Sequence, residues 1–145
     1  MPATFASFAP ILSALELSYP FQLFVREAVT SPGEPNSGGL MAISLPHGAA
    51  IESFGFTGNV AFGEVHALLI RNALSPGGAF DIVADRQFTA TTRQDINKFD
   101  PVSPPHIVDN SNFTYLIEAT AVARNVPAGQ RFDATIYGFG MILNV

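Results

Sequence analysis

The chain has 145 residues, enough for one domain that buries about 70% of the surface that its unfolded chain would expose. Only 13% of the residues are charged, against roughly 25% in typical soluble domains. The net charge is −5, with seven Lys and Arg scattered along the chain, which disfavours binding to nucleic acid. Cysteine is absent, which excludes a disulfide framework and a Cys-based zinc site.

The apolar N-terminal stretch "MPATFASFAPILSALELSYPF" does not have the pattern of a secretory signal. It has no positively charged residues before the apolar run, and the run is interrupted by Pro10, Glu16 and Pro20. No apolar run in the chain approaches the roughly 18–20 residues of a membrane helix, so we expect no membrane insertion. Residues 9–17 suit either one short helical turn or an arm that pairs with another chain.

Apolar side chains recur at every second position in several stretches, which is typical of half-buried strands. These stretches are Phe21–Arg26, Met41–Leu45, Phe80–Thr89 and Phe113–Ala121. The segment Ala61–Leu74 also fits a helical face. Its two apolar faces and Gly63 favour a strand buried between two sheets.

Clusters of turn-forming residues separate these strands, and most of the 11 Pro and 12 Gly lie in them. The clusters are Thr30–Gly39, Ser75–Gly78, Asp100–Pro105 and Asn125–Gly129, and the longest predicted loop is Ser31–Gly39. Many short strands with regular turn signals predict an all-β, antiparallel sandwich or barrel.

The last stretch, "RFDATIYGFGMILNV", changes its pattern in the middle. Ala134 and Ile136 share one parity, whereas Tyr137, Phe139 and Met141 share the other. A β-bulge near Gly138 and Gly140 would explain this change.

The polar cluster Asp109, Asn110, Ser111 and Asn112 precedes the strand that begins at Phe113. It lacks the ligand spacing of a calcium-binding EF-hand loop. An Asx turn that leads into the strand explains these residues most simply. A looser site for calcium or a sugar, with Asp109, Asn110 and Asn112 in a ligand loop, is the alternative.

Catalytic motifs are missing from the sequence. Glu64 and His66 stand two residues apart, so in a strand both side chains would lie on one face as a candidate metal or acid–base pair. An exposed polar pair on the strand explains them more simply, and we favour it. Since no phosphate-binding loop, nucleophile elbow or dinucleotide fingerprint occurs, we expect a protein that is not an enzyme and that needs no cofactor.

Several motifs resemble those of a known family. They are "LPHGAAI" at Leu45–Ile51, Leu69 with Arg71, "VDNSNFTYLIEATA" at Val108–Ala121, and Tyr137 followed by Gly138. Together they resemble a small jelly-roll module that recurs in uncharacterised bacterial and phage proteins. The resemblance covers residues 40–145 and departs at Asn59–Gly63, where the family often has an Asp-rich segment. It implies a jelly-roll β-sandwich of the kind found in trimeric or filamentous surface structures, and no catalytic residues.

We therefore expect residues 1–39 to form an N-terminal arm and flexible loop, followed by a jelly-roll sandwich over residues 40–145. Because charged residues are few, we expect a structural subunit that associates with copies of itself in an extracellular filament, a virion or another surface assembly. Four apolar side chains of the arm would anchor it in a neighbouring subunit: Phe5, Phe8, Ile11 and Leu12. In the alternatives, the arm folds back onto its own domain, or the domain binds a glycan or another ligand through the segment Asp100–Asn112.

Overall fold

The computed structural model describes residues 3–15, 19–24, 27–31 and 33–145. Strands make up 68% of the structure and the described residues contain no helix, hence none that could cross a membrane. The strands are β1 (Ala3–Phe8), β2 (Ser13–Ala14), β3 (Gln22–Phe24), β4 (Glu27–Val29), β5 (Asn36–Ile43), β6 (Ala50–Ala61), β7 (Gly63–Ala73), β8 (Phe80–Ala90), β9 (Gln94–Ile107), β10 (Phe113–Ala123) and β11 (Asp133–Asn144).

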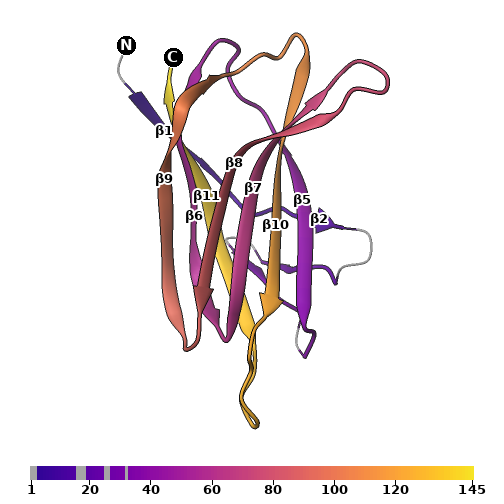
Figure 1. The fold of residues 1–145 in the computed structure, drawn as a ribbon, viewed down its shortest axis with the longest axis vertical. Helices are drawn as coiled ribbons and strands as arrows, with labels where there is room; N and C mark the ends of the chain where they lie inside the picture. The colour runs from indigo at the N-terminus through magenta and orange to yellow at the C-terminus, as the bar shows by residue number, and fades with distance from the viewer. Residues whose placement is uncertain (1–2, 16–18, 25–26, 32) are drawn as a thin grey trace.

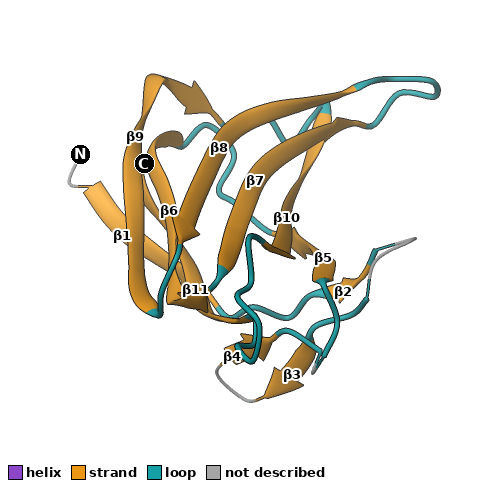
Figure 2. Cartoon of the chain, turned by 60° about the horizontal axis from the view of Figure 1, so that its bottom comes forward, coloured by secondary structure: helices purple, strands orange, loops and turns teal. Residues whose placement is uncertain are grey.

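The strands form two antiparallel sheets that pack face to face as a β-sandwich (Figures 1 and 2). Sheet A has the order β3-β4-β11-β6-β9, and β1 pairs with the second half of β11. Sheet B has the order β2-β5-β10-β7-β8. The predicted all-β, antiparallel sandwich is therefore confirmed.

Strand pairing from β4 to β11 is nested. The hairpin of β7 with β8 lies innermost, and around it pair β6 with β9, β5 with β10, and β4 with β11. Successive pairs alternate between the two sheets. The outermost pair is tied by Thr30, whose hydroxyl accepts a hydrogen bond from the Ala134 amide 104 residues away.

Residues 1–39 supply strands to both sheets. β1 and the β3–β4 hairpin pair along one side of β11 in sheet A, whereas β2 pairs with β5 in sheet B. This segment also fills one side of the core, because Leu12, Phe21 and Ala28 are buried there. A Cβ at Gly39 would lie 2.5 Å from the Leu12 Cβ, so only glycine lets Leu12 pack this closely.

The core lies between the sheets and follows the predicted alternation. In β10, Tyr115, Ile117, Ala119 and Ala121 are buried, which confirms the strand predicted over Phe113–Ala121. Within the segment Ala61–Leu74, residues Gly63–Ala73 form the predicted strand, β7, but along most of it only every second residue is buried. The largest fully buried side chains from other strands are Phe54, Phe56, Phe139, Ile51, Leu69, Ile136 and Met141.

The bulge predicted near Gly138 is present. The register of β11 against β6 shifts between Ile136 and Gly138, so that Tyr137 is the extra residue. This shift explains why Ile136 and Phe139 both point into the core. Tyr137 itself is 48% exposed and does not join the inward set to which its parity assigned it.

Three other predictions were wrong in detail. The Pro-rich segment Asp100–Pro105 is not a turn but part of β9, because an edge strand tolerates proline and a register shift against β6 absorbs the extra residues. The loop predicted to end at Gly39 gives way to β5 at Asn36. Phe80 and Ile82 are exposed, because β8 is an edge strand whose register shifts beyond Ala84.

Candidate functional site

A groove of about 590 Å³ lies between the edge strands of the two sheets, β8 and β9. One wall is Asp81–Arg86 of β8 and the other is Pro101–Ile107 of β9, with Arg71 of β7 at one end. The segment Pro101–Ile107 contains a cis peptide bond between Ser103 and Pro104. In the same segment, the pairing of β9 with β6 loses its regular register, because Ile51 lies opposite His106 whereas Ser53 lies opposite Pro101.

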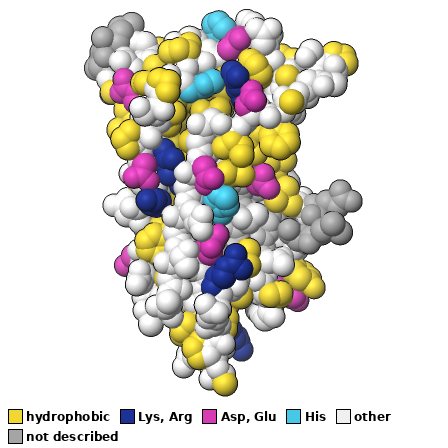
Figure 3. All heavy atoms as spheres, in the orientation of Figure 1, with side chains coloured by type: hydrophobic (Ala, Val, Ile, Leu, Met, Phe, Trp, Pro, Cys, Tyr) yellow, Lys and Arg dark blue, Asp and Glu magenta, His cyan; other side chains and the backbone are white. Residues whose placement is uncertain are grey.

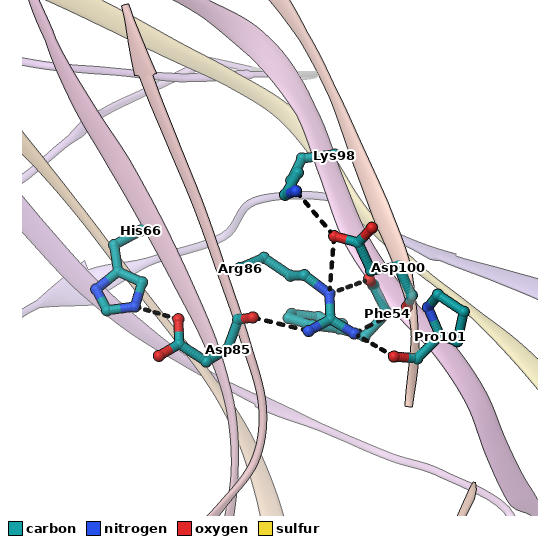
Figure 4. A network of polar contacts seen from close by, with 7 residues as sticks. All are labelled: Phe54, His66, Asp85, Arg86, Lys98, Asp100 and Pro101. Carbon is teal, nitrogen blue, oxygen red and sulfur yellow. Dashed lines mark hydrogen bonds and ion pairs between the residues drawn. The ribbon is translucent and has the colours of Figure 1, made fainter. Parts of the chain in front are cut away.

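Arg86 lines this groove, and its polar contacts join the two sheets (Figure 4). Its guanidinium donates to the carbonyl oxygens of Phe54 (2.9 Å), Asp100 (2.8 Å) and Pro101 (3.0 Å), and its side chain is only 11% exposed. Asp100 also forms an ion pair with Lys98 at 3.0 Å. Sequence reasoning missed Arg86. The signal was its parity, since Arg86 lies between Ala84 and Phe88 on the apolar phase of β8.

Arg71 and Asp81 form the exposed polar end of the groove. The Arg71 Nε donates to the Asp81 carboxylate at 2.9 Å, and the Arg71 guanidinium lies 4.1 Å from the centre of the Phe113 ring. Both side chains are partly exposed, so this pair contributes little to stability. A planar guanidinium beside a carboxylate presents donors and acceptors of the kind that bind vicinal hydroxyl groups.

His106 connects the groove to the turn before β10. Its Nε2 lies 2.9 Å from the hydroxyl of Tyr115, which is buried and also accepts a hydrogen bond from the Asp109 amide. Burial lowers the pKa of His106, and the positive charge of Arg71 lowers it further. A neutral Nε2 can accept the hydroxyl proton of Tyr115, so this arrangement favours the uncharged imidazole.

The polar cluster before β10 forms the predicted Asx turn. The Asp109 carboxylate accepts hydrogen bonds from the Asn112 side chain (2.8 Å) and the Ser111 amide (3.0 Å). These bonds lower the pKa of Asp109, and the bond from Asn112 has the largest effect. Asn110 donates to the Leu45 carbonyl at 2.8 Å. The side chains proposed for a ligand loop are thus engaged with the turn itself, and their binding of a ligand stays a prediction.

Glu64 and His66 both lie on the outer face of sheet B, where Figure 3 shows acidic, basic and His side chains interspersed. They do not form a pair with each other. His66 contacts the Asp85 carboxylate, and Glu64 lies 3.6 Å from Arg124. Among the described residues, no three His or acidic side chains gather as a metal site.

The four proposed anchors of the arm lie in different surroundings. Leu12 is buried in the core of its own chain, and Phe8 packs partly against that core. Phe5 and Ile11 are 60% and 69% exposed. In this structure β1 pairs with β11 of its own chain, and exchange between chains stays a prediction.

A second groove, of about 650 Å³, lies on the outer face of sheet A beside β1. It is lined by uncharged residues, among them Phe5, Phe99 and Tyr137. The Phe5 and Phe99 rings lie 6.1 Å apart, and both cover Gly140, where a Cβ would lie 2.6 Å from the Phe5 ring. We call this region the aromatic groove.

Searches against protein-family models, curated proteins and solved structures find no match to this chain.

Proposed function

We propose that the chain is a structural jelly-roll subunit that associates with copies of itself in an extracellular filament, a virion or another surface assembly. The nested strand pairs support the jelly-roll assignment. Four strands of the six-stranded sheet pair in the order β4-β11-β6-β9, and four of the five-stranded sheet pair in the order β5-β10-β7-β8. These orders support the assignment, because a jelly roll builds two sheets from eight strands; the fold is frequent in capsid proteins and lectins.

One observation supports self-association above the others. The surface beside β1 carries exposed apolar side chains, since Phe5, Tyr137 and Ile142 are 60%, 48% and 37% exposed. Among the described residues, no charged side chain lines the aromatic groove. Exposed apolar surface of this kind typically marks an interaction site.

The N-terminal arm is the part of the chain that we expect to mediate this contact. The proposal has two forms, which differ in whether β1 pairs with β11 of its own chain or with β11 of a neighbour. In one, the arm stays on its own domain, as in this structure, and presents its surface to a neighbour. In the other, the arm makes the same contacts with the neighbour's β11, which is domain swapping.

Particle size in solution tests the proposal. We expect the intact chain to form particles larger than a 15.4 kDa monomer in light scattering, and deletion of residues 1–19 to abolish them. Because the deletion removes the buried Leu12, the substitution Ser7→Lys provides a variant that leaves the core intact. Gln94→Lys adds the same charge at an exposed site on β9 and serves as its control. Assembly that survives both the deletion and Ser7→Lys would refute a role for the arm.

The groove between β8 and β9 favours a second candidate, a module that binds a glycan or another small polar ligand. Arg71, Asp81 and Ser103 line it, and its β9 wall belongs to the segment Asp100–Asn112. This candidate predicts that a saccharide raises the melting temperature and that Asp81→Asn removes the effect. If the ligand loop with Asp109, Asn110 and Asn112 takes part in binding, Asp109→Ala weakens the effect as well. A panel of saccharides that gives no thermal shift would exclude it at the concentrations used.

A further inference from the structure

One long edge of β1 is unpaired in the part of the chain that the structure describes. Among the described elements it pairs only with β11, from Ala3 opposite Asn144 to Phe8 opposite Phe139. Both Figure 1 and Figure 2 place it at the periphery of the molecule. An unpaired edge offers a row of backbone N–H and C=O groups to a further extended strand.

The chemistry of this edge favours a second copy of the chain. Its sequence, "ATFASF", contains neither a charge nor a proline, the devices that usually block edge pairing. Two chains of net charge −5 repel each other, so contact is easiest where no acid lies in the strand. Glu52 accepts a hydrogen bond from Asn144, the residue opposite Ala3 at the outer end of the strand, and so lies on the far side of β11 from the unpaired edge.

Side-chain direction limits how two such strands can pair. Ala6 and Phe8 pack against the core, so Ala3, Phe5 and Ser7 point to the outer face of sheet A. Antiparallel pairing across a two-fold axis keeps the outer faces of both copies on one side. Residues directly opposite each other must then share the same parity.

We propose that two copies join edge to edge through β1, antiparallel, with Phe5 of one copy directly opposite Phe5 of the other. This inference rests on the self-association proposed above and specifies the partner and the register. The register also places Ala3 opposite Ser7, and it adds an aromatic cross-strand pair to the Phe5–Phe99 contact within each copy. The two six-stranded sheets then form one continuous sheet.

Disulfide trapping tests this register cleanly, because the chain contains no cysteine. Directly opposite Cβ atoms lie about 4.5–5.5 Å apart in a sheet, close to the roughly 3.5–4.5 Å of a disulfide. Under mild oxidation at micromolar concentration, we expect Phe5→Cys to form a covalent dimer. Its rate should exceed that of Tyr137→Cys by on the order of 100-fold, since paired strands hold the two thiols at a millimolar or higher effective concentration. Tyr137 is the control because it is exposed beside the same groove but lies away from the free edge.

A second experiment keeps both Phe5 rings. The proposed register predicts that a mixture of Ala3→Cys and Ser7→Cys chains forms a mixed disulfide dimer, whereas neither variant alone dimerises at a comparable rate. Intact mass spectrometry distinguishes the mixed product from the two homodimers. A dimer that forms equally fast from Ser7→Cys alone would overturn the register.

Light scattering on the unmodified protein separates this inference from the proposed function. Large particles without either disulfide would show that assembly uses another surface and would overturn the edge contact alone. Trapping in particles no larger than a dimer supports the edge contact and argues against a filament or virion. A monomer that is not trapped overturns both.

Discussion

The two long sides of the sandwich are built in opposite ways. On one side, β8 and β9 carry Asp85, Arg86, Lys98, Asp100 and three prolines at their edges. Arg86 ties these strands together across the gap between the sheets. On the other side, β1, β2 and β3 contribute the sequences "ATFASF", "SA" and "QLF", none of which contains a charge or a proline.

This difference indicates which side of the molecule can accept another strand. Charges, prolines and irregular register protect the β8–β9 side from edge-to-edge pairing. The N-terminal side lacks these features and has apolar, exposed side chains such as Phe5 and Ile11 instead. The same sandwich therefore has one side closed within the chain and one side suited to association.

The largest expected loss of stability comes from removing Arg86 on the β8–β9 side. We expect Arg86→Met to lower the free energy of unfolding by about 4 kcal/mol, because it leaves two part-buried carbonyls without donors, each at a cost of about 1–3 kcal/mol. Urea denaturation measures this change. Asp81→Asn, in the exposed pair at the other end of the groove, should change stability by less than about 1 kcal/mol. Equal effects of the two substitutions would contradict the role of Arg86.

The next largest loss of stability tests whether the N-terminal arm packs on its own domain. Leu12→Ala should cost about 2–5 kcal/mol, because Leu12 is buried against Gly39. The exposed Ile11 is the control, and Ile11→Ala should cost less than about 0.5 kcal/mol. If the arm stays on its own domain, the loss for Leu12→Ala is independent of protein concentration. A loss that varies with concentration would indicate that Leu12 packs in a neighbour.

A smaller effect concerns the turn between β9 and β10. Asp109→Ala removes the acceptor of two hydrogen bonds and should lower the midpoint of thermal or urea unfolding by less than Leu12→Ala does. Asp109→Asn keeps one acceptor oxygen and should recover part of this loss. No recovery would mean that the turn depends on charge and not on hydrogen bonding.

The smallest effect is a dependence of stability on pH. The folded pKa of His106 lies below its usual value of about 6.5, so between these two values the unfolded chain binds more protons. Stability should thus be complete above about pH 6.5 and should fall as the pH decreases towards the lowered pKa. His106→Gln should flatten this part of the curve in urea titrations at several pH values. A mutant curve parallel to that of the wild type would assign the dependence to other groups.

Much of the fold could be predicted from side-chain alternation. Tyr115, Ile117 and Ala119 are buried where a period of two placed them, and the change of parity before Phe139 indicated the bulge. Alternation succeeds there because these strands lie within their sheets and each has one face on the core.

Prediction failed at the edges and at the candidate site. Pro101, Pro104 and Pro105 resemble a turn in the sequence but belong to an edge strand. The groove needs Arg71, Arg86 and His106 from three different strands, and no local pattern shows that these strands converge. Only the sheet topology brings them together, and topology depends on long-range pairing that alternation does not specify.

The nested pairing has a consequence for the order of events during folding. Its innermost hairpin, β7 with β8, is local, but β1 and β4 pair with β11, which follows all the other described strands in the chain. Long-range pairing of this kind folds slowly, on the order of milliseconds to seconds. In addition, β1 has no partner of its own until synthesis reaches β11. Where nascent chains are crowded, β1 of one molecule would then pair with β11 of another. The timing of synthesis would thus decide whether neighbouring molecules only touch or exchange their N-terminal strands.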